Sequence, residues 1–346
     1  MRTKTRIITL LAVFILLAGG RLTASQLLVN GAGATFPAPL YDRWFNTFAR
    51  IDTGATFNYQ PVGSGGGIAR ITRGIVDFGA SDAPLSDQQL AEAPGKILHF
   101  PTVLGADVIA YNVPRLGLPL RLTGPVVAEI YLGKITKWND RAIAELNPAV
   151  NLPDSPIVVC HRSDGSGTTY IFTDYLSKVS PEWKNKVGVG TSVAWPLGLG
   201  GNGNQGVTEL LKRTDGAIGY VELIYALNNK LPAAPIKNHE GRWVEASIRT
   251  VTAAAANAAA NMPADFRISI TDAPGADSYP MSSFTYLLIY QQQTDAAKGK
   301  ALLGFIQWML HEGQTLAVPL SYAPLPGQVV AAEEAQLKSV ALPNDK

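Results

Sequence analysis

Strand-like and helix-like segments alternate along this chain, and this alternation limits the possible folds more than any other feature. Apolar runs such as IVDFGAS (75–81) and IVVCHR (157–162) indicate buried strands. Amphipathic stretches such as TTYIFTDYLSKV (168–179) have apolar residues at helical spacing. Alternation of this kind is typical of a sheet covered by helices. We therefore predict an α/β fold.

The chain is long enough for two lobes. Its 346 residues exceed what one hydrophobic core usually accommodates. Two long β-rich stretches, at 97–113 and 279–290, are candidates for the segments that cross between the lobes. The glycine-rich stretch GLGGNGNQG (198–206) is expected to be a mobile loop that precedes a helix at 207–213.

The first 24 residues have the pattern of a secretory signal peptide. Three basic residues precede an apolar run at 7–18, which is too short to span a bilayer comfortably, and small residues follow. We predict cleavage after Ala24, although Gly20 also satisfies the small-residue rule. The sequence therefore predicts an exported protein.

The charge and cysteine content exclude several classes of protein. Without residues 1–24, the chain has 25 basic and 27 acidic side chains, so it has no general field that would attract nucleic acid. The single cysteine, Cys160, allows no intrachain disulfide, and its apolar surroundings indicate a small buried side chain rather than a nucleophile. The four histidines lack metal-ligand spacing, and we predict neither a metal nor a cofactor.

Three entrances to predicted helices are rich in glycine and hydroxyl groups: GAGATFP (31–37), VGSGGG (62–67) and RSDGSGTT (162–169). The first N–H groups of a helix lack partners within the helix, and the helix dipole adds positive charge there. Glycines let an anion approach those N–H groups. Taken singly, Thr35, Ser64 and Ser166 also fit ordinary helix caps. Three such entrances in one chain favour a site for a small oxyanion.

Arg162 stands at the start of the third entrance. A guanidinium group can bind a tetrahedral oxyanion through two hydrogen bonds. Alternatively, Arg162 is a surface residue that pairs with Asp164. The two interpretations are compatible, because an acidic neighbour would hold the guanidinium in one orientation.

Asp82 suggests which oxyanion the site selects. It follows a predicted strand, and the next helix already has Ser86 and Gln89 as its capping box, so Asp82 is not needed as a cap. A carboxylate repels an anion unless the anion carries a proton to donate. Phosphate carries such a proton near neutral pH and sulfate does not, which predicts discrimination of about a thousandfold or more.

These segments together resemble a known family. GAGATFPAPLY, YQPVGSGGG, VDFGASDAPLSD, RSDGSGT and WPLGLGGNGN occur in the order found in the periplasmic phosphate-binding proteins of high-affinity phosphate ABC transporters. The likeness extends from about residue 31 to about residue 325. It implies a periplasmic location and a two-lobe, type II periplasmic binding protein fold, with a sheet and flanking helices in each lobe. The implied division places residues 25–103 and 279–346 in lobe I and residues 104–278 in lobe II, joined by a hinge.

The resemblance also implies the ligand set. The family's phosphate ligands correspond to Thr35, Phe36, Ser64, Asp82, Arg162, Ser166, Gly167 and Thr168, with Phe36 and Gly167 binding through backbone N–H groups. Asp164 corresponds to the residue that braces the arginine, and His161 occupies a position where some relatives have arginine. A monomer of this family closes around phosphate between its lobes and delivers it to a membrane permease with ATPase subunits.

Three alternatives remain open from the residues alone. The site could bind another oxyanion, such as sulfate or molybdate, which Asp82 disfavours. GSGT around Ser166 superficially suggests the nucleophile of a secreted phosphatase, but the chain lacks GxSxG and its histidines are scattered. The third alternative is a chemosensory or virulence-related binding protein that feeds no permease.

Overall fold

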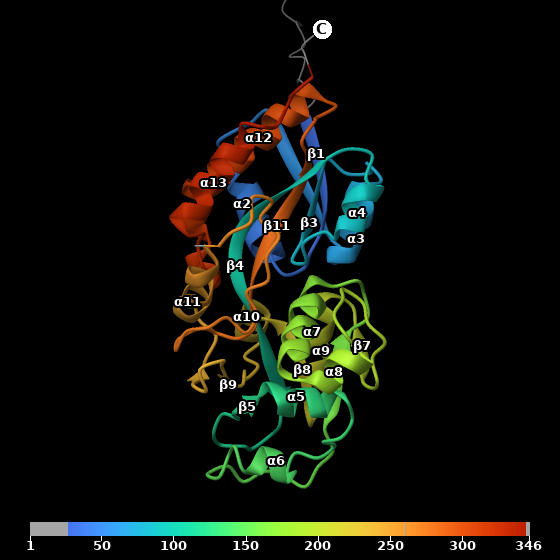
Figure 1. Ribbon diagram of the computed structural model, residues 1–346, viewed down its shortest axis with the longest axis vertical. Helices are drawn as coiled ribbons and strands as arrows, with labels where there is room; N and C mark the ends of the chain where they lie inside the picture. Colours follow the sequence, from blue (N-terminus) through green and yellow to red (C-terminus); the bar gives the residue numbers. More distant parts are fainter. Residues whose placement is uncertain (1–26, 260, 344–346) are drawn as a thin grey trace, which may run out of the picture.

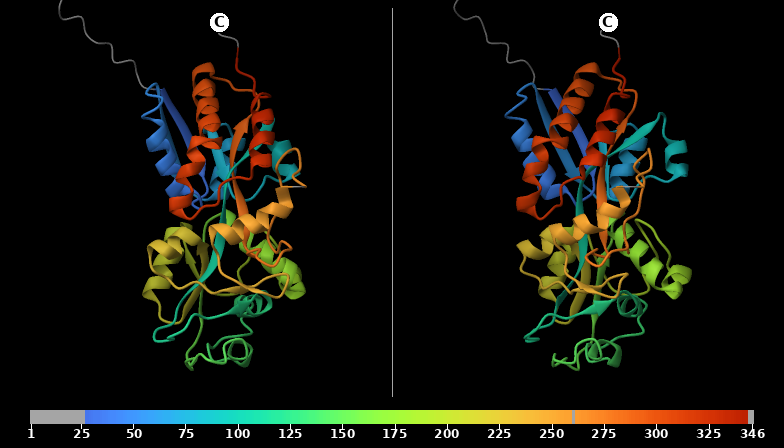
Figure 2. Two further views of the ribbon diagram at one scale, coloured as in Figure 1. Left: turned by 90° about the vertical axis from the view of Figure 1, so that its left-hand side faces the viewer. Right: turned by 60° about the vertical axis from the view of Figure 1, so that its left-hand side comes forward.

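The computed structural model describes residues 27–259 and 261–343. The signal-peptide prediction for residues 1–24 therefore lies outside the described residues. Within the described part, an eight-stranded sheet forms the centre of the molecule and helices lie on both of its sides (Figure 2). The prediction of an α/β fold is confirmed.

The central sheet has the strand order β2-β1-β3-β11-β4-β8-β6-β7. Its strands are β2 (Ala55–Pro61), β1 (Leu27–Gly33), β3 (Phe78–Ser81), β11 (Ser282–Tyr290), β4 (Ile97–Asn112), β8 (Ala217–Glu222), β6 (Val158–Arg162) and β7 (Leu199–Gly201). A smaller sheet has the order β10-β9-β5, with β10 (Trp243–Val244), β9 (Ile236–Lys237) and β5 (Leu122–Thr123).

Strand β4 joins the two lobes of the molecule. Up to Ala106 it pairs with β11, and from Asp107 onward it pairs with β8. Figure 1 shows β4 passing from the upper lobe, built from the N- and C-terminal parts of the chain, into the lower lobe. The long strand expected at 97–113 and the two-lobe fold are confirmed. The lobe boundaries at 103/104 and 278/279 stay predictions.

The helices are distributed between the lobes. The upper lobe contains α2 (Ala38–Phe48), α3 (Ser64–Thr72), α4 (Asp87–Glu92), α12 (Ala296–Leu310) and α13 (Gly327–Leu337), with the short 3₁₀ helices η1 (Glu312–Leu316) and η2 (Val318–Leu320) following α12. The lower lobe contains α5 (Gly124–Tyr131), α6 (Arg141–Ala144), α7 (Gly167–Val179), α8 (Pro181–Lys186), α9 (Gly203–Arg213) and α10 (Leu223–Asn228), while α11 (Ile248–Ala259) contacts β4 and β11. Across the described ranges, no helix is long and apolar enough to cross a membrane.

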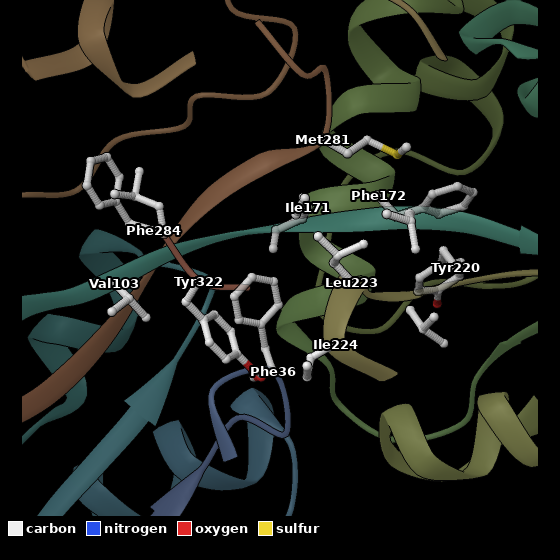
Figure 3. Packing of buried hydrophobic residues seen from close by; sticks show 14 of the residues in the cluster. Phe36, Val103, Ile171, Phe172, Tyr220, Leu223, Ile224, Met281, Phe284 and Tyr322 are labelled. Carbon is white, nitrogen blue, oxygen red and sulfur yellow. Dashed lines mark hydrogen bonds between the residues drawn. The ribbon is translucent and has the colours of Figure 1, made fainter. Parts of the chain in front are cut away.

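Aromatic side chains fill the core of each lobe. In the upper lobe, Phe45 stacks on Phe57 with ring centroids 5.3 Å apart, and both contact Phe305. In the lower lobe, Phe172 stacks on Tyr220 at 4.2 Å. Figure 3 shows that buried apolar residues also continue across the junction of the lobes. Close packing inside each lobe makes it a firm support for the polar groups at the junction.

The prediction of a mobile loop at 198–206 is wrong. Residues Leu199–Gly201 form strand β7, which pairs in parallel with β6, and α9 begins at Gly203 instead of 207. Gly201 lets strand β7 pack closely against α9, because a Cβ at this position would lie 2.5 Å from the backbone nitrogen of Val207. The loop interpretation failed because it considered only the backbone freedom of glycine and not this approach between strand and helix.

Candidate anion-binding site

The second and third glycine-rich entrances meet at the junction of the lobes. The backbone N–H of Gly65 donates to the carbonyl of Gly165 at 2.9 Å. A Cβ on Gly167, the first residue of α7, would lie 2.3 Å from Oδ2 of Asp82 and 2.4 Å from Oγ of Ser64. The N-terminus of α7 therefore faces Asp82 directly, with no room for a side chain at position 167.

The helix-cap interpretation holds for one of the three hydroxyl residues. Ser166 caps α7, because its Oγ accepts a hydrogen bond from the N–H of Thr169 at 3.0 Å. Ser64 is the first residue of α3 and instead bonds to Asp82. Thr35 caps no helix, because Pro37 is the N-cap of α2. Two of the three hydroxyl groups therefore need another explanation.

Arg162 ends strand β6 and is held in one orientation. Its Nε donates to Oδ1 of Asp164 at 2.8 Å, and its Nη2 donates to Oδ2 at 2.5 Å. Its Nη1 donates to Oγ1 of Thr168 at 3.0 Å. The arginine side chain is only 1% exposed, so the surface interpretation is wrong, while the pairing with Asp164 is confirmed. Three of its five N–H groups are used in this way, which leaves two for another acceptor.

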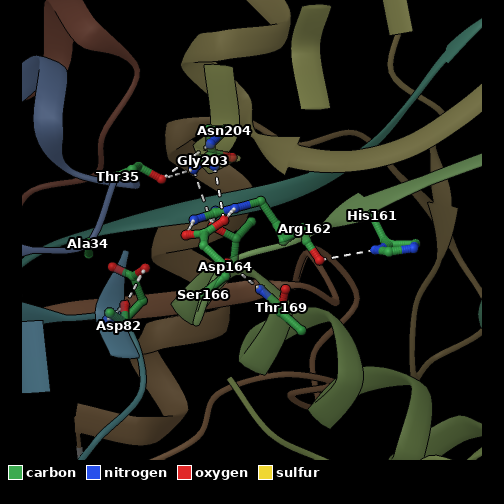
Figure 4. Close-up of polar contacts among 12 residues, drawn as sticks. Ala34, Thr35, Asp82, His161, Arg162, Asp164, Ser166, Thr169, Gly203 and Asn204 are labelled. Atoms are coloured by element: carbon green, nitrogen blue, oxygen red, sulfur yellow. Dashed lines mark hydrogen bonds and ion pairs between the residues drawn. The ribbon is translucent and has the colours of Figure 1, made fainter. Parts of the chain in front are cut away.

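Asp82 follows strand β3 and is 1% exposed. Its Oδ1 accepts from the hydroxyl of Thr285 in β11 at 2.7 Å, and its Oδ2 accepts from Ser64 at 3.3 Å. The expected capping box of α4, formed by Ser86 and Gln89, is present. Asp82 is thus a buried acid with no capping role, and its Oδ2 faces the N-terminus of α7 (Figure 4).

Contacts outside the predicted ligand set fix the positions of Phe36 and His161. The carbonyl of Phe36 accepts from the hydroxyl of Tyr322 at 2.6 Å, and the ring of Phe36 packs against Gly105, which holds the first entrance in place. His161 stacks on Trp195 with ring centroids 4.7 Å apart and points away from the site (Figure 4). The predicted residues Thr35, Phe36, Ser64, Asp82, Arg162, Ser166, Gly167 and Thr168 are all buried in one region, and their role as ligands stays a prediction.

Sequence reasoning missed Asn204, near the start of α9. Its Nδ2 donates to the hydroxyl oxygens of Thr35 at 2.9 Å and Thr168 at 3.2 Å. The backbone N–H of the preceding Gly203 donates to Oδ1 of Asp164 at 3.0 Å. GGNGNQG is thus a fourth glycine-rich helix entrance, and the same pattern that identified the other three could have found it. Thr285 carried no comparable signal.

Comparison with known proteins identifies the family. A model of the PBP superfamily domain matches residues 20–312. The phosphate-binding protein PstS of Xylella fastidiosa (strain 9a5c) is 47% identical over 89% of this chain and 84% of its own length. The phosphate-binding protein PstS of Pasteurella multocida is 43% identical over 92% of both chains. This chain belongs to the PstS family within the PBP superfamily. The predicted resemblance is confirmed.

A solved structure supports the fold of this PstS-family chain. The phosphate-binding protein from Stenotrophomonas maltophilia superimposes with a TM-score of 0.70, and the match covers 89% of this chain and 93% of that one. The two sequences are 21% identical, so this likeness concerns the fold alone.

Burial changes the protonation of the carboxyl groups in this region. Desolvation raises the pKa of Asp82 to about 7, although hydrogen bonds from Thr285 and Ser64 and the charge of Arg162 act in the opposite direction. Burial alone would raise the pKa of Asp164 too, but its hydrogen bonds and ion pair with Arg162 hold that pKa below its usual range. The site therefore pairs a permanent cation with a carboxyl group that titrates near neutral pH.

Two further buried carboxyl groups lie on the neighbouring strands β4 and β8. Asp107 in β4 and Glu222 in β8 are paired in register, and both are fully buried. Desolvation raises the pKa of each well above its usual range, and the negative charge of Asp82 contributes.

Within 27–259 and 261–343, no group of three or more histidine, cysteine, aspartate or glutamate side chains could hold a metal ion.

We predict that the ligand-free protein loses stability as the pH rises from 6 to 8. The folded-state pKa of Asp82, about 7, lies above the unfolded value of about 3.9, so the folded state binds more protons between these values. The stabilisation is complete below about pH 4 and is lost as the pH rises through 7. From pH 6 to pH 8 the free energy of unfolding should fall by about 1.4 kcal/mol through Asp82. Thermal unfolding of wild type and Asp82→Asn in buffers free of phosphate and sulfate measures this, and equal slopes for the two proteins would contradict it.

Proposed function

We propose that this protein binds inorganic phosphate between its two lobes and delivers it to an ABC-type phosphate permease of the inner membrane. In this proposal it is exported to the periplasm by its cleavable signal peptide and acts as a monomeric binding protein, not as an enzyme. The names of its PstS relatives support phosphate as the ligand. The permease, its ATPase subunits and the periplasmic location follow from the family resemblance.

The observation that carries the proposal is the position of Asp82 opposite a set of hydrogen-bond donors. Its Oδ2 faces the N-terminus of α7, where Gly167 leaves no side chain between them. Arg162 supplies positive charge from the same lobe as α7. An anion at this position meets donors on several sides and one acidic acceptor, and an anion that carries a proton satisfies all of them.

The proposed ligands divide between the lobes. The upper lobe contributes Thr35, Phe36, Ser64 and Asp82, and the lower lobe contributes Arg162, Ser166, Gly167 and Thr168, with Asp164 bracing the arginine. A ligand that contacts both sets stabilises the closed arrangement of the lobes by its differential affinity. Closure also removes water, which strengthens the charge-assisted hydrogen bonds.

The same geometry argues against two alternatives. Sulfate has no proton to donate, so above pH 7, where Asp82 is ionised, it would place lone pairs against those of the carboxylate. For a phosphatase, Ser166 would need a general base, yet its Oγ accepts the cap hydrogen bond of α7 and the nearby ring of His161 stacks on Trp195. A binding function therefore fits these side chains better than hydrolysis.

Calorimetric titration of the unfolded and refolded protein, which removes carried-over ligand, tests the proposal. Phosphate should bind with a dissociation constant on the order of 1 μM or lower, because several charge-assisted bonds converge on buried groups. Sulfate and molybdate should bind at least about a hundredfold more weakly. Tighter binding of either ion than of phosphate would contradict the proposal, and so would release of phosphate from p-nitrophenyl phosphate by the pure protein.

A further inference from the structure

Asn204 connects the two proposed halves of the anion site. It lies in the first turn of α9 and is completely buried. Its Nδ2 reaches Thr35 in the upper lobe and Thr168 in the lower lobe, at 2.9 and 3.2 Å. Figure 4 shows Thr35 and Asn204 beside the guanidinium end of Arg162, while His161 lies beyond the backbone end of the arginine. Nothing in the predicted ligand set accounts for this side chain.

We propose that Asn204 is a positioning residue that makes the hydroxyl groups of Thr35 and Thr168 obligatory hydrogen-bond donors to the bound anion. This inference rests on the proposed function, because it takes the anion to be phosphate. It adds to that function a specificity-determining residue that does not itself need to touch the ligand.

The orientation of the Asn204 amide is set by the backbone. Its Oδ1 accepts a hydrogen bond from the N–H of Glu222 at 2.9 Å, and a backbone N–H can only donate. The oxygen of the amide must therefore face β8, and the NH₂ group must face the two threonines. Both hydrogens of that NH₂ group are used, one for each hydroxyl oxygen.

Each threonine hydroxyl then has its two lone pairs occupied. Oγ1 of Thr35 accepts from Nδ2 of Asn204 and also from the backbone N–H of Asn204 at 3.3 Å. Oγ1 of Thr168 accepts from the same Nδ2 group and from Nη1 of Arg162 at 3.0 Å. A hydroxyl group has two acceptor positions and one hydrogen, so only the hydrogen of each threonine remains for a ligand.

The fixed hydroxyl groups determine which hydrogen-bond partners the site offers to an anion. A free hydroxyl can rotate and act as donor or acceptor, which lets a site accept anions in several protonation states. With both threonines restricted to donation, neither competes with the carboxylate of Asp82 as the acceptor of a ligand proton. Asn204 thereby supports the selection that Asp82 performs, although Thr35 is 169 residues away from it in the chain.

The test compares two substitutions at position 204 by phosphate titration. Asn204→Ala removes the donor and should weaken phosphate binding about tenfold, because both hydroxyl groups regain rotational freedom and lose their fixed donor role. Asn204→Asp keeps the acceptor for the N–H of Glu222 but replaces the donor by an acceptor, which draws the threonine hydrogens away from the ligand. It should weaken binding about thirtyfold.

A matched control is available two residues earlier. Asn202 is exposed and makes no side-chain capping bond to α9, so Asn202→Asp makes the same change of charge in the same loop. Its phosphate affinity should stay within about threefold of wild type, since exposed charges are screened. A loss in Asn202→Asp as large as that in Asn204→Asp would assign the effect to general charge and overturn the proposal.

A double-mutant cycle separates positioning of the hydroxyls from a merely structural role. Thr168→Val removes the hydroxyl through which Asn204 acts, so Asn204→Ala should cost about threefold in that background in place of about tenfold. The same cycle with Thr35→Val should give the same reduction. Independent effects, in which the fold losses multiply, would overturn the proposal. Circular dichroism and thermal unfolding of each variant confirm that it is folded.

The outcomes distinguish this inference from the proposed function. If wild type binds phosphate and both Asn204 variants bind it equally well, the role of Asn204 is wrong and the proposed function stands. If the refolded wild type binds no phosphate, both proposals are overturned together.

Discussion

At pH 9, Asp82→Asn is expected to reduce the preference for phosphate over sulfate by about a thousandfold, equivalent to about 4 kcal/mol. At this pH, about two units above the pKa of Asp82, sulfate would face a buried wild-type carboxylate that has no proton to share with it. In the variant, Thr285 can still donate to the amide oxygen, which directs the NH₂ group toward the N-terminus of α7 and the anion. Sulfate then gains a donor, whereas phosphate loses the acceptor for its proton. Phosphate affinity itself should fall only about tenfold.

Competition calorimetry with phosphate and sulfate measures this change. Asp42→Asn is a suitable control, because Asp42 is an exposed aspartate of α2 in the same lobe and its substitution removes the same charge. That control should keep the wild-type preference. If Asp82→Asn rejects sulfate as strongly as wild type does, the carboxylate is not the basis of selection.

Arg162→Ala is expected to lower phosphate affinity by about a hundredfold, or roughly 3 kcal/mol. The substitution removes a buried cation that has two N–H groups left for the anion. It also leaves the carboxylate of Asp164, whose side chain is 12% exposed, without its ion pair. Arg162→Lys should be intermediate, because an ammonium group keeps the charge but lacks the planar fork.

Two controls separate the binding effect from the loss of the ion pair. Arg162→Ala/Asp164→Ala removes both charges, so it should recover part of the thermal stability lost in Arg162→Ala without recovering phosphate affinity. Arg213→Ala, at a side chain that is 81% exposed, should bind phosphate as wild type does. An unchanged dissociation constant in Arg162→Ala would remove Arg162 from the site.

Local sequence information was sufficient for much of the secondary structure. The Ser86 capping box, the Ser166 cap and the pairing of Arg162 with Asp164 join residues only two or three positions apart. Interactions over such short separations depend on the backbone conformation of one turn, so residue type and spacing predict them. The long strand at 97–113 was likewise evident from its β-rich composition.

The contacts that complete the candidate site could not be predicted from local sequence. Thr285 bonds to Asp82 across 203 residues, and Asn204 bonds to Thr35 across 169. Thr285 does not differ in local pattern from ordinary strand residues, and the glycine-rich pattern around Asn204 marks a helix entrance without showing which distant residues it contacts. The misassigned loop at 198–206 has the same origin, because its pairing with β6 depends on where the chain returns in space.

The amino-acid order of this protein was enough to indicate alternating strands and helices, glycine-rich helix entrances and an acid without a capping role, since these depend on neighbours along the chain. The meeting of those entrances, the burial of Asp82 opposite α7 and the orientation of the Asn204 amide arise from the packing of strands β3, β11, β4, β8 and β6. Hydrogen bonds act over about 3 Å, so a polar site exists only where the packed fold brings distant residues within that distance.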